Sequence, residues 1–177
     1  MKTLQTSTIL YMIKPSIIAV AFSKDRKEVL LIKRRDVPVW VLPGGGIEKD
    51  ETIEQALIRE FQEETGYKVL IKRLVGKYTP INKLAKYTYL FECEILSGES
   101  TTGTETKDIK FFKIDNLPKF LPPPYDEWIL DAHKNYPKII EKRLYRVNYL
   151  SLFKNLILHP LLVVRFLLTR IGIYINT

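Results

Sequence analysis

The stretch from Gly45 to Tyr67 reads GGIEKDETIEQALIREFQEETGY, and it decides the fold that the sequence predicts. Its middle, residues 53–65, contains no Gly or Pro and is rich in Glu, Gln, Ala and Leu, all of which favour helix. Thr52 and Gln55 have the spacing of a capping box, with threonine as the N-cap. Gly66 stands where a glycine commonly ends a helix. We therefore predict a helix over residues 53–65.

The predicted helix carries acidic residues beside its apolar face. At about 100° per residue, the apolar side chains form one broad stripe, and Glu60, Glu63 and Glu64 lie on an overlapping arc. Like charges at this spacing repel one another, and carboxylates beside a buried face are costly without a counter-ion. A divalent cation would offset that cost, and oxygen-only ligands favour Mg²⁺ or Mn²⁺ over zinc. The alternative is a solvated acidic helix end, in which Arg59 pairs with Glu63.

The order of charged residues and glycines in this stretch resembles the signature of the Nudix hydrolases, G-x5-E-x7-R-E-U-x-E-E-x-G-U, where U is a bulky aliphatic residue. All seven charged and glycine positions match: Gly45, Glu51, Arg59, Glu60, Glu63, Glu64 and Gly66. Phe61 and Tyr67 depart from the pattern, because both U positions are aromatic here. The resemblance covers roughly residues 15–136. It implies an α/β fold, a Nudix-type α/β/α sandwich with a mixed sheet.

The resemblance also implies a chemistry. Nudix enzymes hydrolyse the diphosphate linkage of a nucleoside diphosphate joined to another group, with divalent ions in place. By position, Glu60, Glu63 and Glu64 would ligate Mg²⁺ or Mn²⁺, with the Gly45 carbonyl as a further ligand. Arg59 would orient the glutamates, while Glu51 and Gly66 would support the loop and the helix. We therefore expect metal-dependent hydrolysis of a nucleoside diphosphate derivative or a nucleoside triphosphate.

The general base is not fixed by the signature. In some family members it is a glutamate of the signature, which here means Glu60 or Glu63. In others it is a carboxylate on a downstream loop, and the best downstream candidate is Glu105, which precedes an apolar, aromatic segment. Glu99 and Asp108 are weaker candidates. The alternative for Glu105 is a solvated charge in a loop.

We expect basic residues near the glycine loop, because they would bind the negatively charged phosphates of a substrate. Arg34 resembles the basic residue that often ends the strand before the glycine loop in this family, and Arg35 is its neighbour. The alternative is that both are charges at the end of a strand. The substrate itself, the number of metal ions and the oligomeric state stay open.

Two other functions compete with hydrolysis of a soluble nucleotide. The chain could be a Nudix-fold nucleotide-binding or regulatory module that does not hydrolyse its ligand, although all three glutamates are present. It could also be a membrane-peripheral hydrolase of lipid-linked or nucleotide-sugar diphosphates, an idea that rests on the C-terminal segment alone.

Strands are expected on both sides of the helix. Apolar, β-branched runs predict two strands before the helix, at residues 16–23 and 29–33. Three more strands are predicted after it, at residues 69–78, 86–96 and 109–114, and a short helix follows them. Residues 43–46 read as a glycine loop, and residues 97–106 read as a loop rich in Gly, Ser and Thr.

The positive charge of the chain is concentrated at its C-terminal end. The net charge is +8 over 177 residues, and residues 134–177 hold eight Lys or Arg but one acidic residue, Glu141, so +7 belongs to this segment. Pro160 and Gly172 bracket a predicted helix that is apolar nearly all round. We predict a Nudix domain over residues 1–137 and a basic, apolar helical extension over residues 138–177.

Three interpretations of the extension compete. In the first, residues 148–177 pack on their own domain or across a dimer. In the second, they lie in a membrane interface, with their basic residues at anionic headgroups. In the third, they span a bilayer, although the predicted helix is short for a transmembrane helix. No nucleic-acid partner is expected, because the segment lacks a stacking platform of the kind that single-strand binders use.

Cysteine usage and the N-terminus bear on location. Cys93 is the only cysteine and lies in an apolar run, so it is expected to be a packed thiol, and no disulfide can form within the chain. Residues 9–13 form only a short apolar run, so no signal peptide is predicted. We expect a cytoplasmic protein, with peripheral membrane contact as the second expectation.

Overall fold

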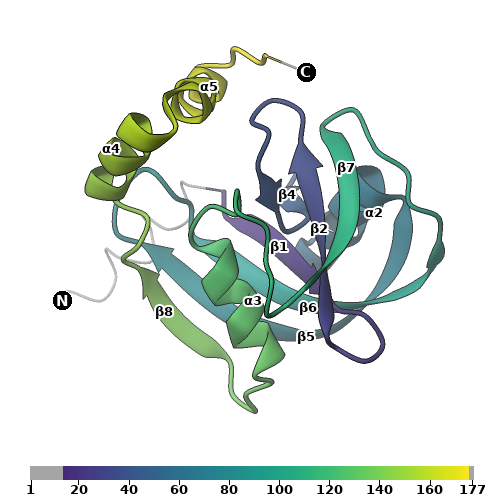
Figure 1. Ribbon diagram of the computed structural model, residues 1–177. Helices are drawn as coiled ribbons and strands as arrows, with labels where there is room; N and C mark the ends of the chain where they lie inside the picture. Colours follow the sequence, from purple (N-terminus) through teal and green to yellow (C-terminus); the bar gives the residue numbers. More distant parts are fainter. Residues whose placement is uncertain (1–13, 176–177) are drawn as a thin grey trace.

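The computed structural model describes residues 14–175 of the chain (Figure 1). Before the first described helix come four strands, and after it come three longer strands, a helix, a further strand and two C-terminal helices. The elements are β1 (Ser16–Ala21), β2 (Glu28–Arg34), β3 (Trp40–Val41), β4 (Gly44–Gly46), α2 (Ile53–Thr65), β5 (Tyr67–Pro80), β6 (Thr88–Gly98), β7 (Thr106–Lys113), α3 (Tyr125–His133), β8 (Ile140–Leu144), α4 (Tyr149–Leu158) and α5 (Pro160–Arg170).

The strands form two sheets. The larger sheet has the order β4-β1-β6-β5-β8 and is mixed, because β1 pairs parallel with β6 and β5 pairs parallel with β8 while the other pairs are antiparallel. The smaller sheet has the order β3-β2-β7 and is antiparallel. The mixed sheet that the sequence predicted is therefore present.

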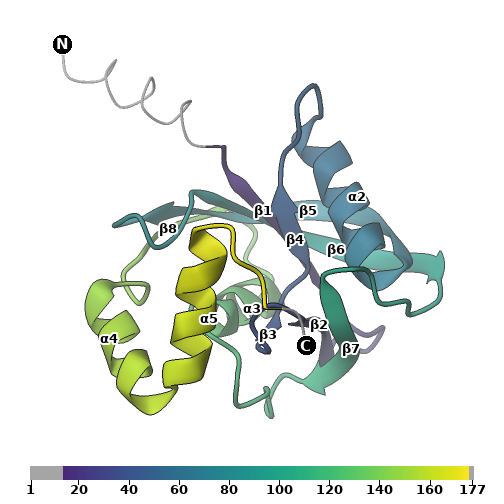
Figure 2. The same ribbon diagram turned by 90° about the horizontal axis from the view of Figure 1, so that it is seen from above.

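The side chains of β1 point alternately into two separate layers of the hydrophobic core. Ile18 and Val20 join the cluster that contains α3, whereas Ile17, Ala19 and Ala21 join the cluster that contains α2. Successive side chains of a strand point to opposite faces, so the two helices cover opposite faces of the sheet region (Figure 2). This is the predicted α/β sandwich.

Helix α2 has the boundaries and caps that its sequence predicts. The Gln55 amide donates to the Thr52 hydroxyl at 3.2 Å, and the Thr52 amide donates to the Gln55 side chain at 2.9 Å, which completes the capping box. Gly66 ends the helix with φ of 76°, and its N–H donates to the Gln62 carbonyl. A left-handed residue here favours glycine.

The glycine segment differs from its prediction as a loop, because Gly44–Gly46 forms the short strand β4 beside β1. A Cβ on Gly44 would lie 2.2 Å from the Ile17 carbonyl oxygen, so only glycine permits this close pairing. The strand β3, at Trp40–Val41, was also not predicted. Both are too short for an alternating pattern to reveal them.

The C-terminal segment contributes one strand to the larger sheet. Ile140–Leu144 forms β8, which pairs with β5, and Lys142 donates to the Asp131 carboxylate at 2.6 and 2.8 Å. Leu144 is buried in the cluster that contains α3. The predicted division of the chain at residue 137 stays a prediction, and these contacts join residues 140–144 to the sheet that precedes them.

Two helices follow β8. The Asn148 side chain caps α4 by accepting from the Ser151 amide at 2.8 Å, and Pro160 opens α5. The predicted apolar helix between Pro160 and Gly172 is therefore present. Within residues 14–175, no helix is long and apolar enough to cross a membrane.

Cys93 is buried in β6 and free, as predicted. Burial raises the pKa of its thiol to about 12. The expectation that concerns residues 9–13 lies outside the described part of the chain.

Candidate active site

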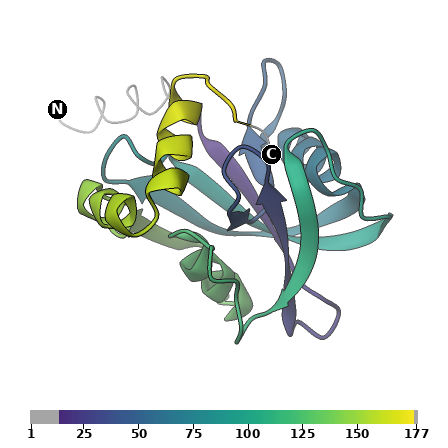
Figure 3. The ribbon, with the colours of Figure 1, turned by 45° about the horizontal axis from the view of Figure 1, so that its top comes forward.

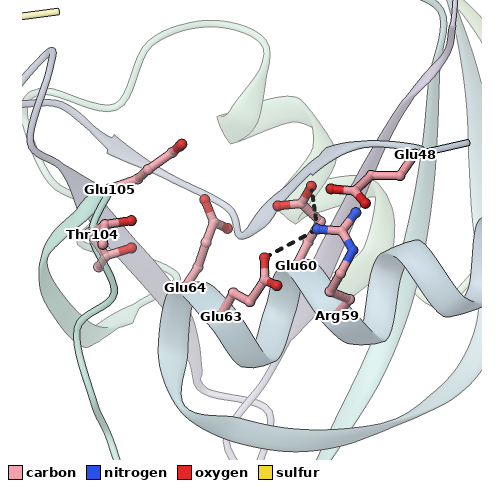
Figure 4. A pocket seen from close by; sticks show the side chains of 8 residues that line it. Glu48, Arg59, Glu60, Glu63, Glu64, Thr104 and Glu105 are labelled. Carbon is pink, nitrogen blue, oxygen red and sulfur yellow. Dashed lines mark hydrogen bonds and ion pairs between the residues drawn. The ribbon is translucent and has the colours of Figure 1, made fainter.

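Three glutamates of α2 face the segment that leads into β7 across a pocket of about 210 Å³ (Figure 4). Glu60, Glu63 and Glu64 come from the last turns of the helix, and Glu105 precedes the first residue of β7. The lining is polar; its other members are Glu48, Arg59, Thr104 and Thr106. The structure thus brings together residues that are 45 positions apart in sequence.

Arg59 links the loop before α2 to the carboxylates of the helix. Its guanidinium donates to Glu51 from Nε at 2.8 Å and from Nη2 at 3.0 Å, a two-pronged contact that fixes its plane. Nη1 lies 3.1 Å from oxygens of both Glu60 and Glu63 (Figure 4). Nη2 also donates to the Gly46 carbonyl at 3.3 Å. One arginine therefore orients three carboxylates.

Glu60 lies directly against the backbone of β4. A Cβ on Gly45 would be 2.4 Å from the Glu60 Oε1 atom, so a side chain at position 45 would occupy the space of the carboxylate. The Gly45 carbonyl accepts a hydrogen bond from the Ser16 hydroxyl at 3.3 Å. Burial raises the pKa of Glu60 above its usual value, although the Arg59 charge opposes the shift.

Glu64 is the most desolvated carboxyl of the pocket. It accepts a hydrogen bond from the Gly44 N–H at 2.8 Å. Burial raises its pKa to about 8, and the neighbouring Glu60 and Glu105 charges add to the shift more than Arg34 offsets. A carboxylate in this place is costly unless a cation joins it.

The donor set fits a divalent cation of the Mg²⁺ or Mn²⁺ kind. Five carboxylates line one small pocket, and such ions prefer oxygen ligands. Within the described chain, no three acidic, histidine or cysteine side chains are already arranged so that they could hold a metal ion. Glu60 and Glu63 both contact Arg59. The Glu63 side chain is 61% exposed, whereas that of Glu60 is 18% exposed.

Of the three downstream carboxylates, only Glu105 lines the pocket. Glu105, the candidate base, lines the pocket opposite α2 (Figure 4). Asp108 instead pairs with Lys110 at 2.8 Å, and neither Asp108 nor Glu99 lines the pocket. The chemical role of Glu105 stays a prediction.

Of the two predicted phosphate-binding arginines, Arg34 has another side-chain partner, and Arg35 contacts the edge of the pocket through its backbone. Arg34 donates to the buried Asp36 carboxylate from Nε at 2.8 Å and also from Nη2. This pairing raises the pKa of Arg34 further. The Arg35 amide donates to the Glu105 carbonyl at 2.9 Å and so ties the end of β2 to the pocket rim. Neither arginine lines the pocket, and their substrate-binding role stays a prediction.

Three residues that line the pocket could not be recognised in the sequence. Glu48 and Thr104 are ordinary loop residues in the sequence, and no pattern marks them. Thr106 is fully buried, and its hydroxyl has no hydrogen-bond partner among the described residues. A buried polar group without a partner is unusual and fits a pocket that takes a polar ligand.

The chain was compared with known proteins. A family model described as "NUDIX domain" matches residues 12–132. This chain belongs to the NUDIX domain family. The matched part contains α2, both sheets except β8, and the carboxylate pocket, and it ends inside α3.

Relatives of this Nudix protein carry the names of diphosphate-cleaving enzymes. A Methanocaldococcus jannaschii protein named "ADP-ribose pyrophosphatase" is 38% identical over 102 residues, which are 54% of this chain and 60% of that protein. A Bacillus subtilis protein named "Putative 8-oxo-dGTP diphosphatase" is 38% identical over 100 residues, which are 56% of this chain and 66% of that protein. The chain thus spans less than two thirds of the length of these two curated relatives.

Solved structures have the same fold. An ADP-ribose pyrophosphatase from Streptococcus suis matches with a TM-score of 0.59 and 25% identity, over 73% of this chain and 98% of that one. A NUDIX hydrolase from Nitrosomonas europaea matches with a TM-score of 0.61 and 24% identity, over 73% of this chain and 78% of that one.

Proposed function

We propose that this Nudix protein hydrolyses the diphosphate linkage of a nucleoside diphosphate derivative or a nucleoside triphosphate, with Mg²⁺ or Mn²⁺ as cofactor. The observation that carries the proposal is the convergence of Glu60, Glu63, Glu64 and Glu105 on one polar pocket. The names of the relatives support it, because they describe cleavage of ADP-ribose and of 8-oxo-dGTP. Both compounds contain a phosphoanhydride bond.

The residues of α2 would form the metal site. Glu60, Glu63 and Glu64 would hold the cation, with the Gly45 carbonyl as a further ligand, and Arg59 would keep the carboxylates in position before it arrives. When bound, the cation would neutralise phosphate charge and acidify the attacking water. The products would be two phosphate esters, or a nucleoside monophosphate and pyrophosphate if the substrate is a triphosphate cleaved between its α and β phosphates.

Glu105 is the proposed general base. It lies on the wall opposite the α2 glutamates, so it can accept a proton from a water molecule held between the two walls. Glu60 and Glu63 are the alternative bases, but each already forms an ion pair with Arg59 at 3.1 Å. Glu105→Gln should then lower kcat by about 10²–10⁴-fold with little change in KM.

A substrate panel tests the proposal. The purified chain would be incubated with Mg²⁺ and nucleoside triphosphates, 8-oxo-dGTP, ADP-ribose, nucleotide sugars and dinucleoside polyphosphates, beside the variant Glu63→Gln. Turnover of one class that the variant loses would support diphosphate hydrolysis and name the substrate class. Nucleotide binding without turnover of any compound would support the non-hydrolysing module instead.

A further inference from the structure

The last two helices carry an apolar surface that is exposed among residues 14–175, the part of the chain that the structure describes. We call α4 and α5 together, residues 149–170, the C-terminal helix pair. Figures 1 and 3 show the pair beside the sheet region, on the side away from α2. The two helices pack on each other. The pair follows the part of the chain that the family model matches.

The apolar side chains of the pair are largely exposed. Nine of the 23 exposed large hydrophobic residues in the described chain lie within the C-terminal helix pair, and four more lie in residues 171–175. In α4 no residue is buried, and in α5 only Val163 is. An exposed apolar cluster of this density marks an interaction site.

The exposed residues form stripes. Leu150, Phe153 and Ile157 are 78%, 60% and 67% exposed, and at 100° per residue they share an arc of about 60° on α4. On α5, Leu161 is 79% exposed, and Val164 follows one turn later. Helices of this length are marginal in water unless an apolar face is packed. Their faces therefore need a partner surface.

The positive charge of the C-terminal helix pair indicates which kind of surface it binds. No acidic residue occurs after Glu141, whereas Lys154, Arg165 and Arg170 lie within the pair. A symmetric contact between two such helix pairs would bring positive charge against positive charge. A surface that is both apolar and negatively charged suits both the apolar stripes and the basic residues. An anionic lipid bilayer is such a surface.

We propose that the C-terminal helix pair lies in the interface of an anionic bilayer, with its apolar stripes among the acyl chains and its basic residues at the headgroups. The short length of each helix suits a position in the interface, and neither is long enough to span a bilayer. Peripheral attachment would then hold the catalytic pocket near the membrane. This inference does not depend on the proposed hydrolysis.

Flotation with vesicles tests the proposal. Full-length protein would be mixed with phosphatidylcholine vesicles or with vesicles that contain about one third phosphatidylglycerol. We expect flotation with the anionic vesicles, several-fold less with the neutral ones, and a decrease as salt is raised. Lys154→Gln should weaken binding to the anionic vesicles about fivefold.

A matched pair of variants isolates the apolar surface. Phe153→Ser with Leu161→Ser should reduce flotation at least about tenfold. Leu70→Ser with Leu96→Ser changes two exposed leucines of β5 and β6 and should leave flotation unchanged. Circular dichroism would show that both double variants remain folded.

Hydrogen exchange of the unmodified protein provides a second test if a variant fails to fold. Amides of residues 149–170 should gain protection when anionic vesicles are added. Three results would each overturn the proposal: no flotation at any salt concentration, equal flotation of the two double variants, or no added protection in this segment. A dimer in solution that Phe153→Ser with Leu161→Ser dissociates, without vesicle binding by the parent, would assign the surface to a second copy.

Discussion

Arg59 donates two hydrogen bonds to Glu51, at 2.8 and 3.0 Å, and so fixes the loop before α2 to the helix that carries the pocket glutamates. Glu51→Gln keeps the size of the side chain but removes its charge and one acceptor. Arg59 would then lie closer to Glu60 and Glu63 and would compete with the metal ion for these two carboxylates. We expect turnover to fall about 10–100-fold, as for other groups that orient metal ligands.

Metal titration of the rate would check this prediction. If Arg59 acts by orienting ligands, Glu51→Gln should raise the Mg²⁺ concentration needed for half-maximal rate as well as lower the maximal rate. An unchanged metal requirement with lower turnover would show that Glu51 acts in another way.

Adjacent glycines offer a sharp contrast. Gly45→Ala should displace Glu60, because the added Cβ would lie 2.4 Å from Oε1, and we expect turnover to fall at least about a hundredfold. Gly46→Ala meets nothing within 4 Å and should retain activity. Steady-state kinetics of the two variants would check this, and similar losses in both would argue against the role given to Gly45.

The C-terminal boundary of the catalytic unit can be located by stability. A chain that ends at Pro137 loses β8, together with Leu144 and the Lys142 partner of Asp131. We expect its free energy of unfolding to fall by at least about 2 kcal/mol relative to a chain that ends at Val147. Urea unfolding would check this. Equal stability would place the boundary at residue 137, as the sequence predicted.

Cys93 gives a pH-dependent test of the core. Because burial raises the pKa of its thiol to about 12, the native protein holds the neutral thiol between pH 7 and 9. The unfolded chain ionises near the ordinary pKa, so burial of this thiol favours the native state less as pH rises above that value. Iodoacetamide should therefore modify native Cys93 slowly across this range and modify it rapidly in urea. A native rate that climbs with pH like that of a free thiol would contradict the burial.

Local patterns predicted the centre of the site. Thr52, Gln55 and Gly66 specify the ends of α2 through contacts with near neighbours, and helical spacing alone brings Glu60, Glu63 and Glu64 together. Glu105 was chosen by resemblance, because many members of the family have a glutamate a few residues before an aromatic strand, which here is β7.

Contacts between distant segments could not be predicted. The pairing of Gly44–Gly46 with β1 and of β8 with β5 depends on register between segments with no alternating pattern of their own. The Asp36 partner of Arg34 is hidden in the sequence, because an isolated carboxylate does not indicate whether it will be buried. The exposure of the last two helices also depends on packing, because an apolar sequence alone predicts burial.

The most direct test of the central claim is the dependence of diphosphate hydrolysis on divalent metal, measured with the preferred compound of the panel. We expect a rate that saturates with Mg²⁺, disappears with EDTA, returns when Mg²⁺ is restored, and is about 10³-fold or more lower in Glu63→Gln. Hydrolysis that EDTA leaves intact, or that Glu63→Gln retains in full, would contradict the assignment of these carboxylates as the metal site.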